Sequence, residues 1–376
     1  MLSIETRNFR ILRCSKWTPS GVCAVVGPTG SGKTTLFSVP HFLRNAYNRT
    51  VSNAASYESF AGSWGLRSWG STDDEPVVIG LEVGNLRWEL QLITRGESLS
   101  DQTGEKVTRG EEVLLSRLPL SDRFIYKGSE FPCDERLVLR TVFESHRPDD
   151  LKSLILAITS FRTYGEYNLR GLRANGSRQS TDQYLHPSGE NLFSVLRNWR
   201  ERREYRDQYR FVVSGLKSAF PELYDDIDFH SAGLTVTADF LDPHFKVSCP
   251  SALAPNGWMT GLMHLTAVAG AREGSLIEID EFENTLHPYA IRQLLNAIRD
   301  WAESHDLTVT LATHSPVLLD EFKDTPESVF VMEGPDRPVS LDTLFEKDWL
   351  SRFSLGRLFE HGEFGGQTSR PVEAAN

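Results

Sequence analysis

The sequence predicts an α/β fold in which a mixed sheet carries a phosphate-binding loop, and three stretches support this prediction. An apolar strand runs into a glycine-rich turn at residues 24–37, AVVGPTGSGKTTLF. A second apolar strand ends in paired acids within residues 274–288, GSLIEIDEFENTLHP, and a third ends in a histidine within residues 307–320, LTVTLATHSPVLLD. Strands separated by helices pair in parallel, so their carboxyl ends meet at one edge of the sheet. We therefore expect one site built from three distant segments.

The glycine-rich turn matches the phosphate-loop pattern G-x-x-x-x-G-K-[ST], placed between a strand and a helix expected from Thr34 to about Asn48. Glycines let the backbone bend so that its N–H groups converge on phosphates, and the helix N-terminus adds a partial positive charge. Lys33 would reach the β- and γ-phosphates, and the Thr34 hydroxyl would ligate Mg²⁺. The expected nucleotide contacts in this loop are Gly27, Pro28, Thr29, Gly30, Ser31, Gly32, Lys33, Thr34 and Thr35.

The paired acids that end the second strand suit the metal and the water of a nucleotide site. Asp280 would hold Mg²⁺, usually through water, and Glu281 would polarise the attacking water beside the γ-phosphate. His314 ends the third strand, beyond a helix expected at residues 289–304, and could sense the γ-phosphate. An acidic turn and a structural histidine are the plainer alternatives, and the phosphate loop upstream argues against both.

Length and composition are those of a water-soluble globular protein. The chain has 376 residues, 39% of them hydrophobic and 24% charged, which suffices for one large domain or two ordinary ones. It shows neither an apolar run of membrane-helix length nor a signal peptide, so we expect a cytoplasmic protein without a membrane partner. The net charge of −11 counts against a dedicated DNA-binding protein. We expect the scattered cysteines to be reduced thiols: Cys14, Cys23, Cys133 and Cys249.

The order of patterns suggests four regions: an N-terminal lobe at 1–95, an inserted helical and β lid at 96–250, a C-terminal lobe at 251–335 and a tail at 336–376. Residues 1–13 alternate like one strand, and residues 76–94 alternate on both sides of Gly84-Asn85, which predicts an antiparallel hairpin.

Between the two lobes the patterns are less specific. Residues 56–76 are irregular and predict a loop. Residues 191–220 predict an amphipathic helix or helix pair, with a DNA-contacting arm as the alternative, and residues 233–247 predict two strands. Asp226 and Asp228 form the only D-x-D in the chain, which we interpret as a solvated turn.

The motifs GPTGSGKTT, LIEIDEFENTLHP and TLATHSP, in this order, resemble those of ABC-type ATPases of the SMC, RecF and OLD (overcoming lysogenization defect) group, in particular bacterial ATPases of the AAA_21 type. The resemblance covers roughly residues 1–45 and 250–320. It implies an ABC-type P-loop fold with a mixed or antiparallel β lobe, ATP and Mg²⁺ as ligands, and a dimer or higher oligomer formed through the ATPase heads. It also implies Lys33, Glu281 and His314 as catalytic residues. NFRIL is similar to the group's N-F-R-S-[LI], so Arg10 is a candidate nucleotide contact.

One departure from the group concerns its L-S-x-G signature, which caps the γ-phosphate bound by the opposite subunit. Residues 251–265 read SALAPNGWMTGLMHL, which puts Pro255 at the serine position. Asn256 and Gly257 remain candidate contacts through an amide and a helix N-terminus. We therefore expect slow or partner-dependent turnover. A Q-loop glutamine is not evident, and Gln91 is only a guess.

Three functions fit the resemblance. The first is a sensor or scaffold ATPase that controls a separate nuclease or toxin in a bacterial anti-phage defence system. About 60 residues follow His314, too few for the Toprim nuclease domain of full-length OLD proteins. The second is a RecF- or SMC-like DNA-repair ATPase that clamps DNA, with residues 197–210 as its only basic segment, and the third is a transporter subunit. We favour the first, because the acidic balance and the lack of effector chemistry both agree with it.

Overall fold

A central six-stranded sheet organises the molecule, and the phosphate-loop strand lies in its interior. The computed structural model describes residues 2–57, 65–72, 75–95, 98–244, 246–334 and 337–366. Strand β3 pairs in parallel with β16 on one side and β17 on the other, and only β18 runs antiparallel. The strands lie in the order β10 (Arg162–Tyr164), β15 (Leu276–Ile279), β16 (Thr308–Ala312), β3 (Val22–Val26), β17 (Val329–Val331) and β18 (Val339–Ser340). The predicted parallel arrangement of the three motif strands is confirmed.

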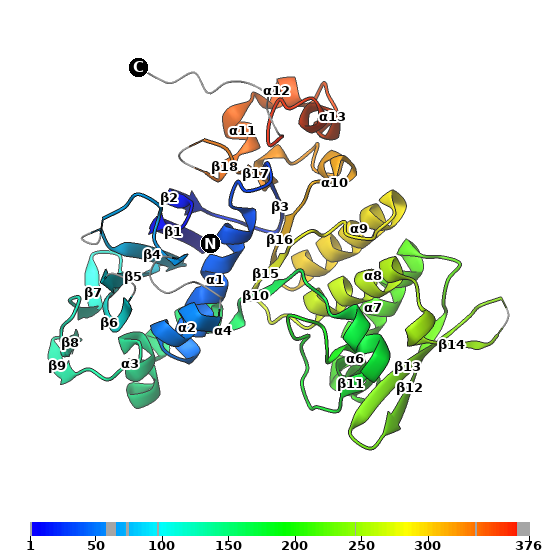
Figure 1. Ribbon diagram of the computed structural model, residues 1–376, viewed down its shortest axis with the longest axis horizontal. Helices are drawn as coiled ribbons and strands as arrows, with labels where there is room; N and C mark the ends of the chain where they lie inside the picture. Colours follow the sequence, from blue (N-terminus) through cyan, green and yellow to red (C-terminus); the bar gives the residue numbers. More distant parts are fainter. Residues whose placement is uncertain are drawn as a thin grey trace.

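A second, eight-stranded antiparallel sheet forms the lobe beside the phosphate loop (Figure 1). The hairpin predicted at Gly84-Asn85 is confirmed, since β4 and β5 pair on either side of it. The sheet continues past the expected boundary at residue 95 as far as Pro132, so strands of the expected lid region belong to the N-terminal lobe. Its order is β2 (Leu12–Trp17), β1 (Leu2–Phe9), β4 (Val77–Val83), β5 (Leu86–Arg95), β6 (Ser98–Arg109), β7 (Glu112–Arg117), β8 (Arg123–Tyr126) and β9 (Ser129–Pro132).

The prediction of a single strand at residues 1–13 is wrong, because the chain reverses between β1 and β2. Asn8 and Arg10 take left-handed backbone conformations, with φ of 59° and 51°. The Asn8 side chain holds the reversal, since it donates to the Glu75 carbonyl at 2.9 Å and accepts from the Ser68 N–H at 3.1 Å. An asparagine tolerates this conformation better than most residues, but no glycine marks the turn in the sequence. The reversal carries Arg10 to the edge of the phosphate loop.

Helix α1 (Lys33–Asn48) follows the phosphate loop and lies between the two large sheets (Figure 1). Alternate residues of β3 face opposite sides of the central sheet: Cys23 and Val25 pack with α1, and Ala24 and Val26 pack with the helices of the other face. This alternation buries the strand on both faces, as a parallel strand requires. The other helices of the N-terminal lobe are α2 (Val51–Tyr57), α3 (Val138–His146) and α4 (Lys152–Ser160). Of the loop predicted at 56–76, residues 58–64 and 73–74 lie outside the described part of the chain, and 65–72 run as turns against β1.

The opposite face of the central sheet carries a helical layer and a small antiparallel sheet. The helix pair predicted at residues 191–220 is confirmed as α6 and α7. The solvated turn predicted at Asp226 and Asp228 is wrong: both lie in β12, where Ile227 between them is buried. A strand with one buried face places such acids on its outer side. This layer comprises α5 (Leu169–Asn175), α6 (Leu192–Glu201), α7 (Arg206–Ala219), α8 (Asn256–Ala269), α9 (Pro288–Ser304), β11 (Ser177–Arg178), β12 (Asp226–Ala232), β13 (Thr235–Leu241) and β14 (Ser248–Pro250).

The C-terminal segment folds back onto the main core beside the third motif, at the top of Figure 1. Asp320 accepts hydrogen bonds from the Ser354 hydroxyl at 2.6 Å and the Gly356 N–H at 2.9 Å. The helices here are α10 (Pro316–Asp320), α11 (Leu341–Leu344), α12 (Lys347–Leu350) and α13 (Leu355–Glu360), and 3₁₀ turns occur at Asp149–Leu151, Arg203–Tyr205, Ser251–Leu253 and Pro326–Ser328. Across the ranges given above, no helix combines the length and apolar character needed to cross a bilayer.

Candidate functional site

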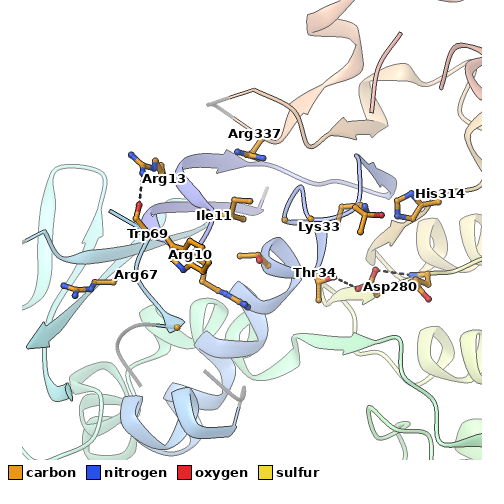
Figure 2. Close-up of a pocket in the computed structure, with 16 residues that line it drawn as sticks. Arg10, Ile11, Arg13, Lys33, Thr34, Arg67, Trp69, Asp280, His314 and Arg337 are labelled. Carbon is orange, nitrogen blue, oxygen red and sulfur yellow. Dashed lines mark hydrogen bonds between the residues drawn. The ribbon is translucent and has the colours of Figure 1, made fainter. Parts of the chain in front are cut away.

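A pocket of about 1120 Å³ lies where the phosphate loop, the ends of β15 and β16 and the β1–β2 turn meet (Figure 2). Lys33, Thr34, Asp280 and His314 lie at one end, and Arg10, Arg13, Arg67 and Trp69 at the other. Its lining residues are Arg10, Ile11, Arg13, Thr29, Gly30, Gly32, Lys33, Thr34, Thr35, Gly65, Arg67, Trp69, Asp280, Glu281, His314 and Arg337. The three sequence motifs therefore converge on one cavity.

The phosphate loop needs its glycines for space as well as for backbone conformation. Gly30 and Gly32 have φ of 81° and 104°, which L-residues rarely adopt. A Cβ on Gly32 would lie 2.6 Å from Ile11, and a Cβ on Gly27 would lie 2.6 Å from the Ser31 hydroxyl. The loop is thus fixed in a tight bend. Gly27, Pro28 and Ser31 shape this bend from beneath and are not among the lining residues.

Lys33 places an ammonium group inside the bend. Its Nζ donates to the Gly27 carbonyl at 2.7 Å and the Pro28 carbonyl at 3.3 Å. Burial lowers the pKa of Lys33, while the nearby carboxylates, Asp280 first among them, oppose that shift. A partly buried cation held by carbonyl groups gains from an added anion, so this position suits a phosphate group.

Thr34 and Asp280 face each other across the start of α1, and their side chains fit a magnesium ion. The Thr34 hydroxyl donates to Asp280 Oδ2 at 2.9 Å (Figure 2). The backbone of Asp280 is held by its N–H bond to the Tyr164 carbonyl at 2.8 Å, and a Cβ on Gly165 would lie 3.1 Å from the Asp280 Cβ. A hydroxyl and a carboxylate are hard oxygen ligands of the kind Mg²⁺ takes in small number, alongside phosphate oxygens and water.

Glu281 lines the pocket with an exposed side chain and a strained backbone. Its φ of 51° is left-handed, which costs a non-glycine residue roughly 1–2 kcal/mol. The backbone is held on both sides of Glu281. The Asp280 N–H donates to the Tyr164 carbonyl of β10, and the Phe282 N–H donates to the Ala312 carbonyl at 3.3 Å. Strain of this kind persists where surrounding contacts enforce it, and it is common at functional sites.

Glu283 joins the acidic motif to the histidine motif, a role that the sequence analysis missed. Its carboxylate accepts from the Thr313 hydroxyl at 2.7 Å and from the His314 N–H at 2.6 Å. Burial, followed by the charge of Lys33, lowers the pKa of His314, which keeps its ring neutral at neutral pH. The available signal was the second glutamate of DEFEN, two residues beyond Glu281.

The outer wall of the pocket contains Arg10, the candidate nucleotide contact, and several residues that no motif indicates. The Arg13 guanidinium donates to the Trp69 carbonyl at 2.8 Å, and Arg337 donates to the Ser31 carbonyl at 3.1 Å. The Trp69 side chain is 88% exposed. Arg13, Arg67, Trp69 and Arg337 come from a strand, an irregular segment and the C-terminal segment, which meet only in the folded chain.

Asn256, Gly257 and Gln91 lie outside this pocket. Asn256 is exposed at the start of α8, and a Cβ on Gly257 would lie 2.6 Å from the Thr285 carbonyl oxygen. Gln91 lies in β5, where its amide donates to Glu89 at 3.0 Å. The signature position thus packs against the loop after β15 and does not line the pocket formed by the chain's own phosphate loop.

A family model described as "AAA domain, putative AbiEii toxin, Type IV TA system" matches residues 22–320. The chain belongs to this AAA_21 family. The match runs from the strand of the phosphate loop past His314, so it includes every motif that forms the inner end of the pocket. The predicted AAA_21-type ATPase family, with its mixed α/β fold, is confirmed, and this family implies a nucleotide with Mg²⁺. Among curated proteins, none matches the sequence.

Solved structures similar to this AAA_21 chain include three SMC heads. The Smc head bound to the C-winged helix domain of ScpA is 12% identical, with 91% of this chain and 99% of that chain covered, at a TM-score of 0.46. The SMC head domain from Thermotoga maritima is 11% identical, with 90% and 98% covered, at 0.38. The Smc head from Pyrococcus furiosus with an extended coiled coil, bound to the C-terminal domain of ScpA, is 10% identical, with 94% and 100% covered, at 0.45.

Proposed function

We propose that this AAA_21 protein binds ATP with Mg²⁺ and hydrolyses it to ADP and phosphate. One observation carries the proposal: Lys33, the Thr34–Asp280 pair, Glu281 and His314 come from three distant strand ends and line one pocket. Each group suits a different part of a nucleoside triphosphate. A single chain therefore offers candidate groups for the phosphates, the metal and the water.

The proposed chemistry rests on position and charge. Lys33 and the loop N–H groups neutralise the phosphates, and Thr34 and Asp280 hold Mg²⁺, which when bound offsets charge on the phosphate oxygens. Glu281 orients the attacking water and accepts its proton. His314, neutral and joined to the acidic motif through Glu283, contacts the γ-phosphate. Such a site needs no covalent step, because electrostatic preorganisation supplies the acceleration.

The outer end of the pocket suits the base and the ribose. The exposed Trp69 offers a flat face, Ile11 adds apolar surface and Arg10 adds charge near the loop. The total volume of about 1120 Å³ slightly exceeds the usual range of small-molecule sites, about 300–1,000 Å³, so a whole nucleotide fits.

Two variants test the proposal. Glu281→Gln removes the proton acceptor and keeps the shape, so kcat should fall about 100-fold or more while ATP still binds.

Lys33→Ala removes a charge-assisted contact worth about 1.5–3 kcal/mol, so ATP affinity should fall tenfold or more. Fluorescent-nucleotide titration and phosphate release measure the two effects, with the exposed Lys152→Ala as the control. Hydrolysis by Glu281→Gln at the wild-type rate would exclude Glu281 as the base.

We further propose that this ATPase is a sensor or scaffold subunit that controls a separate effector, such as a nuclease or toxin, in a bacterial anti-phage system. The family description names a putative toxin of a type IV toxin–antitoxin system, which supports a defence setting. Among the residues that the structure describes, no group of three or more His, Cys, Asp or Glu side chains could hold a metal. Slow or partner-dependent turnover fits such a switch.

Direct DNA clamping has less support. Four of the six arginines in its only basic candidate, residues 197–210, are paired with acids: Arg197 with Glu201, Arg200 with Asp226 and Asp228, Arg202 with Glu204, and Arg210 with Asp207. These pairs leave less positive charge for phosphates.

Phage plating on cells that carry the gene with its neighbours tests the defence role. Protection that disappears with Glu281→Gln supports it, and equal plaque numbers with and without the genes contradict it.

A further inference from the structure

One face of α8 is packed along the loop that carries Glu281. Gly257, Thr260 and His264 are spaced three and four residues apart, so they share a face of the helix. Gly257 approaches the Thr285 carbonyl so closely that a Cβ would lie 2.6 Å from it, and the Thr260 and Thr285 hydroxyls are 3.0 Å apart. His264 makes the third contact, deeper in the protein.

His264 is buried and uses both ring nitrogens. Nε2 lies 3.0 Å from the Phe282 carbonyl oxygen, Nδ1 lies 3.0 Å from the Tyr167 hydroxyl, and the ring stacks on Phe282 with centroids 4.8 Å apart. Burial lowers the pKa of His264 to about 4, so the ring is neutral at neutral pH. A carbonyl can only accept, so Nε2 carries the proton and donates to Phe282, and Nδ1 accepts from Tyr167.

We propose that His264 is a positioning residue for Glu281, acting by holding the Phe282 carbonyl and thereby the left-handed backbone of Glu281. This inference rests on the proposed ATPase function. Phe282 follows Glu281 directly, and its N–H is already bonded to the Ala312 carbonyl. The Phe282 N–H belongs to the peptide that follows Glu281, and the Phe282 carbonyl belongs to the peptide after that. With both groups held, residue 282 cannot turn, which helps to keep the strained φ of 51° at Glu281.

Tyr167 extends this arrangement to the metal side of the site. It lies two residues beyond Gly165, which packs against Asp280, and its hydroxyl donates to the unprotonated Nδ1 of His264. The chain of contacts Tyr167–His264–Phe282 therefore links the loop after β10, helix α8 and the Glu281 loop.

Two amide variants separate positioning from simple packing. In His264→Gln the side-chain amide can donate from about the place of Nε2 and keep the Phe282 bond. In His264→Asn the shorter amide reaches only the place of Nδ1 and loses that bond. We expect kcat of the asparagine variant to fall about tenfold to a hundredfold, as for a misplaced catalytic group, with KM little changed, while the glutamine variant stays close to wild type.

Hydrogen exchange of the amides at residues 281–283 gives a readout that does not need activity. It should quicken in His264→Asn and stay near the wild-type rate in His264→Gln. Equal kcat and equal exchange in the two folded variants would overturn the inference. If the wild-type protein does not hydrolyse ATP, the proposed function fails, and the exchange comparison alone decides the role of His264. If the asparagine variant does not fold, Tyr167→Phe replaces it, with faster exchange expected and unchanged exchange contradicting the inference.

Discussion

Glu283 links the acidic motif to the histidine motif through hydrogen bonds. A single carboxylate accepts from the hydroxyl of Thr313 and the N–H of His314, both on the neighbouring strand end. A water-orienting group and a phosphate-contacting group must stay in register, and this side chain sets their relative position. It touches neither phosphate nor water in the proposed mechanism, so its effect on hydrolysis is indirect.

Glu283→Gln should therefore reduce kcat more than ATP affinity. An amide offers one oxygen in place of two and removes the charge, which weakens contacts worth about 1.5–3 kcal/mol each. Single-turnover hydrolysis and nucleotide titration measure the two quantities, with Glu303→Gln on the exposed face of α9 as the matched control. A variant that hydrolyses at the control rate would show that His314 keeps its place without Glu283.

His264 also predicts a pH dependence of folding. The pKa of His264 is about 6.5 in the unfolded chain and about 4 in the folded protein. As the pH falls, the unfolded chain therefore takes up a proton before the folded protein does, which favours unfolding. The stabilising contribution is complete above pH 6.5 and is lost between there and pH 4. From pH 7 to pH 5 this loss is about 2 kcal/mol. Urea unfolding of wild type and His264→Gln measures it: the wild type should lose that much more stability, and parallel pH curves would contradict the burial of a neutral ring.

The site residues that the sequence could predict are those at the carboxyl ends of parallel strands, because the direction of the chain brings these ends to one edge of the sheet. Lys33, Thr34 and Asp280 stand at the ends of parallel strands or the start of the next helix, so local sequence is enough to bring them together. Trp69 and Arg337 could not be predicted in this way, because they reach the pocket from segments without a periodic pattern. Glu283 had a signal in its spacing, but its partner Thr313 is visible only once β15 and β16 are paired.

At the level of helices and strands, the errors have a common cause. The sequence predicts one strand through Arg10 because the reversal there uses no glycine, and it predicts a turn at Asp226–Asp228 because both acids are polar. In both places tertiary contacts decide: the Asn8 side chain holds the reversal, and pairing with β13 makes the strand. The elements with strong hydrophobic patterns, α1, α9 and the β4–β5 hairpin, agree with prediction within a few residues.

Helix α13 gives a test of how the C-terminal segment supports the site. A Cβ on Gly356 would lie 2.4 Å from the Pro316 carbonyl oxygen, which belongs to α10, two residues beyond His314. Gly356→Ala must push the two helices apart, an overpacking that typically costs about 1–3 kcal/mol. We expect a lower unfolding temperature and slower hydrolysis. Arg357→Ala, on the exposed side of the same helix, should change neither, and a Gly356→Ala protein as stable and active as that control would show that α10 moves freely.

In the whole molecule, the central sheet separates two cores and leaves the start of α8 exposed. Helix α1 belongs to the core shared with the antiparallel sheet, whereas α8 and α9 belong to the other. Leu253, just before α8, is 74% exposed, and Asn256 is exposed at its first turn. A helix N-terminus presents free N–H groups and partial positive charge, which favours an anion. A second head that offers its bound nucleotide would meet this requirement.

ATP should therefore drive assembly of the Glu281→Gln protein, which holds the nucleotide without consuming it. Mass photometry with ATP and Mg²⁺ should show species heavier than the 42.4 kDa chain, and Lys33→Ala should remain at that mass. Because the net charge is −11, added duplex DNA should change nothing at physiological salt. A mass that stays at one chain with ATP would contradict head-mediated assembly. DNA binding that requires ATP and weakens steeply with salt would instead identify a clamp, and the search for an effector would give way to a search for the DNA structure that it holds.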